Sequence, residues 1–111
     1  NQSLDDAHTR TAFTEECKKL GIESTRLILE GFSNHEAYFE AYQRVDIALD
    51  PFPYNGGTTT IGTLWMGVPV VTLKGDRLIA HVGETILHHL GHPEWIAQNK
   101  QNYKEIATQL A

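Results

Sequence analysis

The segment Asn55-Gly56-Gly57-Thr58-Thr59-Thr60 has the residue types of an anion-binding site. Glycines let a ligand approach the main chain closely, and they permit backbone angles that other residues avoid. The threonines stand where a helix is expected to begin. The first turn of a helix offers free N–H groups and the positive end of the helix dipole, and threonine hydroxyls could add donors. The segment could therefore hold a phosphate or a diphosphate without a lysine or an arginine.

A plain helix N-cap after a glycine turn is the other interpretation of these residues, and such caps are common. The segment does not match the Walker A pattern, because no Gly-Lys-Ser/Thr follows it, nor does it match the dinucleotide glycine fingerprint. Its position favours a ligand. It follows the short apolar run Ile47-Ala48-Leu49, and ligands of parallel α/β sheets bind beyond the carboxyl ends of the strands.

Three short apolar segments predict the strands that position this loop. They cover residues 26–30, 46–50 and 68–73. The first, around Leu27-Ile28-Leu29, shows no alternation of polar and apolar residues, which is typical of a parallel strand buried on both faces. Pro69 is compatible with the third strand only near its beginning.

Amphipathic patterns predict helices between and after these strands. Their expected limits are set by cap and stop residues. The expected helices are one near 13–20 closed by Gly21, one opened by the capping-box spacing of Ser33 to Glu36, one from Thr58 with Gly67 as its stop, one from a cap at Asp76 to Leu90 that Gly91 ends, and one ending at Leu110.

The alternation of strands and helices indicates an α/β fold, a Rossmann-like parallel sheet with helices on both faces. We expect one such domain over residues 1–111. Right-handed crossovers would bring the loops at 31–34, 50–57 and 74–76 to one edge of the sheet. The loop at 50–57 contains the glycine pair, so that edge is the expected ligand site.

Composition excludes several classes of function. The 111 residues are 41% hydrophobic and 21% charged with a net charge of −5, so we expect no nucleic-acid or membrane partner. Cys17 is the only cysteine, which favours a reducing, cytoplasmic compartment. No apolar run reaches the roughly 20 residues of a membrane span, and no signal-peptide pattern opens the chain. Because the only methionine is Met66, we expect the chain to be part of a longer protein.

A cluster of histidines raises the question of a metal site. His81, His88, His89 and His92 lie on or just after one expected helix, with Glu84 one turn before His88. Zinc sites need a sufficient set of ligands and a supporting second shell. Histidines near a helix C-terminus are the simpler explanation, so we expect neither a metal nor another cofactor.

Other polar and aromatic residues have structural explanations beside functional ones. Asp76-Arg77 is expected to form a helix cap with a surface ion pair. Lys74 could approach a phosphate or remain a solvated turn residue. Asp50 is expected to be a strand-end or packing residue, not a general base. Trp65 and Trp95 are expected to be packing anchors.

A longer string carries a family resemblance. Residues 45–60, Val-Asp-Ile-Ala-Leu-Asp-Pro-Phe-Pro-Tyr-Asn-Gly-Gly-Thr-Thr-Thr, are followed at 64–73 by Leu-Trp-Met-Gly-Val-Pro-Val-Val-Thr-Leu. Together they resemble the catalytic region of protein O-linked N-acetylglucosamine transferases, above all of bacterial members that follow tetratricopeptide repeats. The resemblance runs from about the first expected strand to the C-terminus.

The resemblance implies the C-terminal, donor-binding half of a GT-B glycosyltransferase. The donor would be a UDP-sugar, typically UDP-N-acetylglucosamine, and the acceptor a serine or threonine hydroxyl of a protein. The N-terminal Rossmann half and tetratricopeptide repeats would lie outside this chain, which should not catalyse transfer alone. The implied substrate-binding residues are Ser33 at the uracil, His35 near the ribose, Tyr38 near the base, Gly57 beside the sugar, Thr58 and Thr59 at the leaving diphosphate, and Gly56 and Thr60 in the same loop.

This sequence departs from the family pattern at several positions. Gly62 stands where the family often has a carboxylate for the ribose hydroxyls, and Leu78 and His81 replace residues that are commonly histidine and arginine. Relatives of the Spindly type use GDP-fucose, so the base stays open. Two alternatives also stay open: a degenerate nucleotide-binding or scaffold domain without transfer activity, which Gly62 favours, and a flavodoxin-like regulatory domain, which the order of elements permits.

Overall fold

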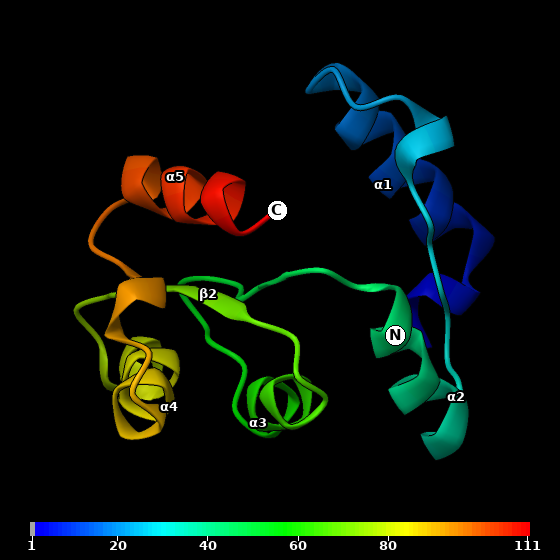
Figure 1. Cartoon of the computed structure of the whole chain (residues 1–111). Helices are drawn as coiled ribbons and strands as arrows, with labels where there is room; N and C mark the ends of the chain where they lie inside the picture. The colour runs from blue at the N-terminus through cyan, green and yellow to red at the C-terminus, as the bar shows by residue number, and fades with distance from the viewer. Residues whose placement is uncertain (1) are drawn as a thin grey trace. The chain divides into compact units, whose positions relative to one another are not determined.

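A computed structural model describes residues 2–111 (Figure 1). The chain divides into two compact units, one reaching to Tyr38 and the other covering Phe39–Ala111. In the described part of the chain, no helix combines the length and the apolar character needed to cross a membrane.

The first unit is built on helix α1, Ala7–Lys19. Asp6 caps this helix, because its carboxylate accepts from the amide of Thr9 at 2.7 Å. The helix ends at Leu20, and Gly21 takes the left-handed conformation with φ 82°, as its type predicts. Cys17 is buried on this helix, where a free cysteine packs as a small apolar residue. Short 3-10 turns cover Gln2–Asp5 and Ser24–Arg26.

The strand predicted at 26–30 is wrong. Residues 27–30 pair with no strand among the described residues, and the side chain of Ile28 is 78% exposed. The segment is held instead by contacts with the N-terminal helices: Arg10 donates to the carbonyl of Leu29, and the amide of Phe32 donates to Asp5 at 3.0 Å. An apolar run becomes a strand only where a second strand satisfies its main-chain groups.

Helix α2, His35–Ala41, begins one residue later than the capping-box spacing predicts. Asn34 is the cap, since its side-chain oxygen accepts from the amide of Ala37 at 2.9 Å. Ser33 therefore does not cap the helix. A 3-10 turn at Tyr42–Arg44 follows.

The second unit contains a parallel sheet of three short strands in the order β1-β2-β3. They are β1 Ala48–Leu49, β2 Val70–Leu73 and β3 Ile96–Ala97. Ala48 pairs with Val70, and Thr72 pairs with Ile96. The predictions at 46–50 and 68–73 are confirmed. Strand β3 was not predicted, because two residues after the 3-10 turn Pro93–Trp95 give no periodic pattern.

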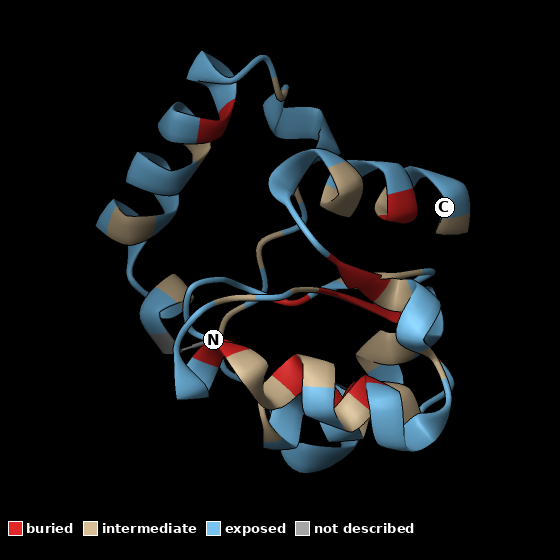
Figure 2. Cartoon of the chain, turned by 90° about the vertical axis from the view of Figure 1, so that its left-hand side faces the viewer, coloured by how far each residue is buried: buried red, intermediate tan, exposed pale blue. Residues whose placement is uncertain are grey.

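Helices cover both faces of this sheet (Figures 1 and 2). Helix α5, Lys100–Leu110, packs on β2 and β3 from one side, whereas α3, Thr58–Trp65, and α4, Val82–Leu90, lie on the other. Figure 2 shows the buried residues concentrated in the strands and on the helix faces turned toward them. The predicted α/β architecture is confirmed in this unit.

The helix predicted from Asp76 to Leu90 is two elements. A 3-10 turn, Leu78–His81, precedes α4, and no side chain caps either of them. Asp76 is therefore not a helix cap. The predicted helix ends are confirmed, since Gly67 after α3 and Gly91 after α4 both have φ 79°.

Candidate functional site

Asp50 anchors the glycine-rich loop at the carboxyl end of β1. Its side chain is 3% exposed. One carboxylate oxygen, Oδ1, accepts from the amide of Gly56 at 2.8 Å, and the other, Oδ2, accepts from the hydroxyl of Thr72 at 2.7 Å. Because Thr72 lies in β2, the carboxylate ties the loop to the neighbouring strand.

Tyr103 of α5 also holds Asp50 in place, from the face of the sheet opposite to α3 and α4. Its hydroxyl donates to the main-chain oxygen of Asp50 at 2.9 Å. Burial, and after it the negative charge of Asp50, raises the pKa of Tyr103 to about 12. The ring of Phe52 packs edge-on against the Tyr103 ring at 5.5 Å, next to a cis peptide bond between Phe52 and Pro53. The start of the loop is thus fixed by α5 as well as by β2.

Asn55 shapes the loop from inside. It is 3% exposed, and its amide nitrogen donates to the carbonyl of Pro51 at 3.0 Å. Among the described residues, its buried oxygen Oδ1 has no hydrogen-bond partner. The side chain closes the turn and does not project from it.

Helix α3 begins directly after the glycine pair, as predicted. Gly57 is its N-cap residue, with φ −116° and ψ −87°, and no side chain caps the first turn. Thr58 and Thr59 are exposed, whereas Thr60 is 4% exposed. The first turn thus offers main-chain N–H groups and the hydroxyls of Thr58 and Thr59. The buried Thr60 hydroxyl does not face solvent.

Two neighbouring glycines in this loop have different roles. A Cβ at Gly56 would lie 2.7 Å from the Thr60 hydroxyl oxygen and 3.3 Å from Asp50 Oδ1, so no side chain fits there. A Cβ at Gly57 would meet its nearest neighbour, a Val82 methyl, at 4.0 Å. Gly56 is needed for packing, whereas the position of Gly57 has room for a Cβ beside the helix start.

A small cavity of about 160 Å³ lies beside this loop. It is lined by Ala48, Leu49, Asp50, Pro51, Gly56, Thr59, Thr60, Thr63 and Val70. Thr63 donates to the main-chain oxygen of Thr59 at 2.8 Å and so supports the first turn of α3. The cavity and the exposed helix start together form the polar site at this edge of the sheet.

The cations nearest in sequence to this edge are engaged with other groups or point to solvent. Lys74 forms an ion pair with Glu84 at 3.0 Å, and His81 contacts the other oxygen of Glu84 at 2.7 Å. The hydrogen bond from His81, and then the one from Lys74, lowers the pKa of Glu84. Arg77 is exposed and lines a separate cavity of about 230 Å³ with Phe52, Lys74 and Asp76 among others.

The histidines form local pairs. His88 lies 3.9 Å from Glu84, and His92 lies 2.9 Å from Glu94 and stacks on the ring of Trp95. In the part of the chain that the structure describes, no group of three or more histidine, cysteine and acidic residues could hold a metal ion.

The three base and ribose candidates belong to the first unit. Ser33 precedes α2, and His35 and Tyr38 lie within it. Ser33 and His35 are exposed, and the Tyr38 side chain is 37% exposed. Their roles at a nucleotide stay predictions.

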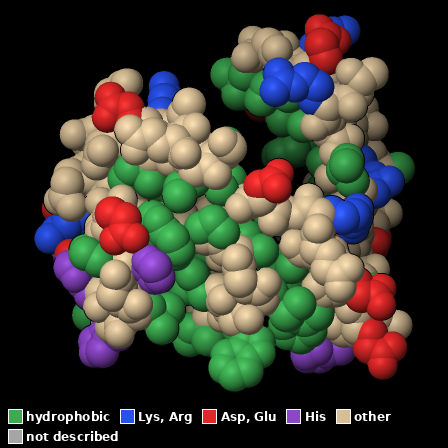
Figure 3. Space-filling view, in the orientation of Figure 1, with side chains coloured by type: hydrophobic (Ala, Val, Ile, Leu, Met, Phe, Trp, Pro, Cys, Tyr) green, Lys and Arg blue, Asp and Glu red, His purple; other side chains and the backbone are tan. Residues whose placement is uncertain are grey.

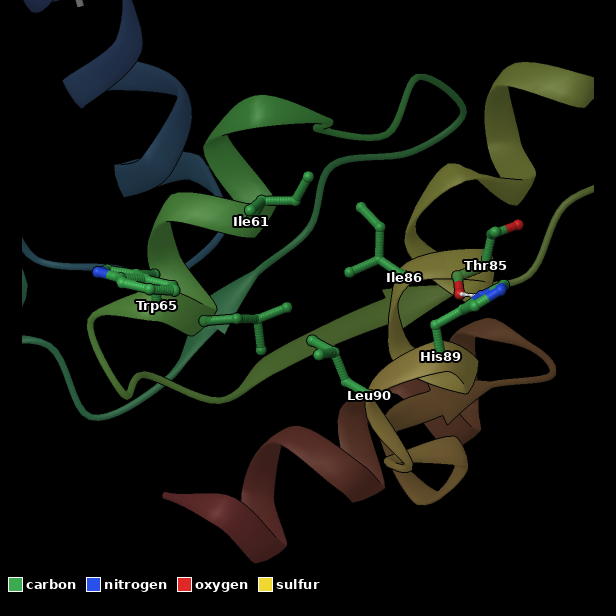
Figure 4. A pocket seen from close by; sticks show the side chains of 7 residues that line it. Ile61, Trp65, Thr85, Ile86, His89 and Leu90 are labelled. Atoms are coloured by element: carbon green, nitrogen blue, oxygen red, sulfur yellow. Dashed lines mark hydrogen bonds between the residues drawn. The ribbon is translucent and has the colours of Figure 1, made fainter.

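An apolar groove separates α3 from α4. It has a volume of about 510 Å³ and is lined by Ile61, Leu64, Trp65, Thr85, Ile86, His89 and Leu90. Figure 3 shows hydrophobic side chains gathered on this face, and Figure 4 shows Ile61 and Ile86 projecting toward each other across the groove. Trp65 is 86% exposed, so the prediction that it is a packing anchor is wrong. The groove offers too few donors for a phosphate.

Three contact residues around the loop were not predicted as site residues: Asp50, Thr72 and Tyr103. Asp50 was expected to be a strand-end or packing residue. It does lie at the end of β1, but its hydrogen bond from the Gly56 amide was not predicted. The only signal in the sequence is a polar residue directly after the apolar residues of β1 and another inside β2. The hydrogen bond from Tyr103 to Asp50 joins residues 53 positions apart, so no local pattern in the sequence indicates it.

A parallel α/β sheet with a glycine turn and an open helix start beyond a strand is typical of Rossmann-like nucleotide-binding domains. The model of the family described as glycosyl transferase family 41 matches residues 6–111. This chain belongs to glycosyl transferase family 41, as its resemblance predicted.

Individual relatives agree with this family. The probable UDP-N-acetylglucosamine–peptide N-acetylglucosaminyltransferase SPINDLY of Eustoma exaltatum subsp. russellianum is 40% identical over 92% of this chain, and that of Arabidopsis thaliana is 38% identical over the same share. The UDP-N-acetylglucosamine–peptide N-acetylglucosaminyltransferase of Caenorhabditis elegans is 33% identical over 85% of this chain and 8% of its own length. The chain spans 11% of the SPINDLY relatives.

A solved structure is also similar. An O-GlcNAc transferase mutant of Thermobaculum terrenum matches 96% of this chain and 21% of its own, with a TM-score of 0.93 and 33% sequence identity. This likeness confirms the α/β Rossmann-like fold expected of the C-terminal half of a GT-B enzyme.

Proposed function

We propose that this chain is the donor-binding part of a protein O-glycosyltransferase. The loop at 55–60 and the start of α3 would hold the diphosphate of a nucleotide sugar. One observation carries the proposal: the first turn of α3 is uncapped and presents Thr58 and Thr59 to solvent, directly after a glycine pair that buried contacts fix in place. The names of the relatives support a UDP-sugar donor and a peptide acceptor.

The chemistry that this site would assist is the departure of a nucleoside diphosphate. In transfer to a hydroxyl, the acceptor oxygen gives up its proton to a base outside this site and bonds to the anomeric carbon, while the bond from that carbon to the β-phosphate oxygen breaks and its electron pair leaves with the diphosphate. Negative charge then grows on the diphosphate. Fixed N–H donors stabilise this charge without reorganising. Thr58 and Thr59 would supply two such amides, together with their hydroxyls.

The site does not depend on a nearby cation. The chain has a net charge of −5, and Lys74 is engaged with Glu84. Backbone donors and the helix dipole would therefore carry the binding of the diphosphate. Gly57, where the nearest neighbour of an added Cβ is 4.0 Å away, leaves space for the sugar beside the helix start.

Binding of the base and the ribose of the donor rests on the resemblance alone. By the resemblance, Ser33 would bind the base through its main chain, His35 would lie near the ribose, and Tyr38 would lie near the base. UDP-N-acetylglucosamine is the proposed donor, and GDP-fucose is the alternative that the resemblance leaves open. The protein acceptor, the N-terminal Rossmann half and the tetratricopeptide repeats would be provided by the remainder of a longer protein, for which a bacterial origin and a cytoplasmic location are proposed.

A second candidate function is a degenerate nucleotide-binding or scaffold domain without transfer activity. Gly62 favours it, because a glycine cannot bind the ribose hydroxyls as a carboxylate would. The flavodoxin-like alternative loses its support, since the chain belongs to a glycosyltransferase family.

A transfer assay tests the proposal against the scaffold alternative. The full-length protein that carries this chain is incubated with serine- and threonine-containing peptides and with labelled UDP-N-acetylglucosamine or GDP-fucose. The proposal predicts label on a peptide hydroxyl with at least one donor. Binding of UDP without transfer from either donor would favour the scaffold function.

A further inference from the structure

Asp50 is a buried acid that the proposed binding of the diphosphate leaves without a role. Its side chain is 3% exposed, and placing a carboxylate there is costly unless partners compensate. Both of its oxygens have partners: Gly56 N–H at 2.8 Å and the Thr72 hydroxyl at 2.7 Å. An apolar side chain could fill such a position at lower cost. The polar contacts therefore point to a task beyond packing.

The bond from Gly56 orients the loop next to the proposed phosphate site. Gly56 and Gly57 are consecutive glycines, which have the greatest backbone freedom of any residues. Anchoring the Gly56 amide restricts that freedom immediately before the N–H groups of Gly57, Thr58 and Thr59. Without the anchor, these donors would have to be ordered when the ligand binds, which weakens affinity.

Direct attraction cannot be what Asp50 contributes. A negative charge this close to a bound diphosphate repels it. The carboxylate also removes one N–H, that of Gly56, from the set that a ligand could use. A net benefit from Asp50 must therefore come from geometry.

The carboxylate is itself held in place from two sides. Thr72 is fully buried in β2 and donates to Oδ2. Gly83 of α4 packs directly on this pair, since a Cβ at Gly83 would lie 2.6 Å from Asp50 Oδ2 and closer still to the Thr72 hydroxyl. The rotation of the Asp50 side chain is thus restricted by β2 and α4.

We propose that Asp50 is a positioning residue, held by Thr72, that presets the amides of Gly57 to Thr59 for a diphosphate. This inference rests on the proposed function, because it assigns the anchor of the same loop. If the proposal is correct, the side chain at position 50 must accept a hydrogen bond from the Gly56 amide, but it need not carry a negative charge.

Substitutions at Asp50 separate geometry from charge. In Asp50→Asn the amide oxygen can still accept from Gly56, and the amide nitrogen can donate to Thr72, so UDP and inorganic pyrophosphate should bind as tightly as to the wild type or more tightly. In Asp50→Ala the anchor is lost, and we expect the dissociation constants for both probes to rise about ten- to a hundred-fold. Isothermal titration of the 111-residue chain measures both.

Thr72 gives a second test if Asp50→Ala does not fold. Thr72→Val keeps the shape but removes the hydroxyl, and it should weaken pyrophosphate binding, whereas Thr72→Ser should retain it. Asn99→Ala is the matched control: it removes the cap of α5, a hydrogen bond from the Asn102 amide to Asn99 Oδ1 at 2.8 Å, and leaves the carboxylate contacts of Asp50 intact. It should lower thermal stability but leave the dissociation constants unchanged.

A spectroscopic readout distinguishes positioning from general stability. The Gly56 amide proton should move upfield in Asp50→Ala and Thr72→Val, and stay close to its wild-type position in Asn99→Ala. Equal binding of pyrophosphate by the wild type, Asp50→Ala and Thr72→Val would overturn the inference and leave the proposed function standing. No binding of UDP or pyrophosphate by the wild type would overturn both.

Discussion

Gly83 of α4 faces the hydroxyl of Thr72 in β2 with no room for a side chain between them. Helix and strand approach each other this closely at the point where Thr72 holds the carboxylate of Asp50. The glycine is therefore a packing requirement of the loop anchor.

Gly83→Ala should destabilise the second unit. The added methyl group would overlap Thr72 and Asp50, both buried, and overpacking of this kind costs about 1–3 kcal/mol. Gly62→Ala is the matched control, because a Cβ there would meet only Phe39 at 3.8 Å, an ordinary contact. In this control the free energy of unfolding should stay unchanged or rise by up to about 1 kcal/mol, because alanine has a higher helix propensity than glycine. Urea unfolding monitored by circular dichroism measures both, and equal stabilities would contradict the close packing at Gly83.

Thr58→Ala and Thr59→Ala should each impair donor use in the full-length protein. Both residues are exposed in the first turn of α3. By analogy with the loss of one transition-state donor, turnover should fall by a factor of roughly ten to a thousand. Thr108→Ala is a suitable control, since Thr108 is an exposed helical threonine of α5. Turnover that stays unchanged in both variants would remove these hydroxyls from the mechanism.

Gly62→Asp tests whether the ribose contact can be restored. Gly62 lies one helical turn after Thr58, and the space beside it admits a side chain. If the nucleotide lies as the resemblance implies, the variant should bind UDP more tightly and inorganic pyrophosphate no more tightly. Titration of both ligands, with Gly62→Ala as control, makes the comparison. If the variant gains affinity for pyrophosphate alone and none for UDP, the ribose does not lie beside position 62.

The titration of Tyr103 makes the free energy of unfolding depend on pH in the alkaline range. Its folded-state pKa is raised to about 12, above the unfolded value of 10.0, so the folded protein keeps the proton longer. The contribution is fully present below pH 10 and is lost as the pH rises toward 12, because the unfolded chain binds fewer protons in that range. The stability difference between the wild type and Tyr103→Phe should therefore shrink from pH 9 to pH 11. A constant difference in denaturant unfolding would contradict this.

Local patterns predicted the part of the site that is continuous in sequence. The glycine pair and Thr58 indicated a helix start, and α3 begins at Thr58. The stop glycines Gly67 and Gly91 were predicted because a left-handed C-terminal residue follows from residue type alone. Such features depend on neighbours a few positions apart.

Features that depend on distant partners were missed or wrong. The apolar run at Leu27-Ile28-Leu29 has the composition of a strand, but no described strand pairs with it. Strand β3 is only Ile96–Ala97 and exists because β2 pairs with it. Likewise, the role of Asp50 is set by Thr72 and Tyr103, whose positions relative to Asp50 are fixed by the folded sheet.

The central claim is that a nucleotide diphosphate binds at the start of α3. Nuclear magnetic resonance titration of the isotope-labelled chain with UDP, GDP and flavin mononucleotide tests it most directly. The account predicts saturable shifts of the amides of Gly57 to Thr60 with UDP or GDP, larger than any shift in α5. No response of these amides to either nucleotide at millimolar concentration, or shifts confined to the groove between α3 and α4, would contradict it.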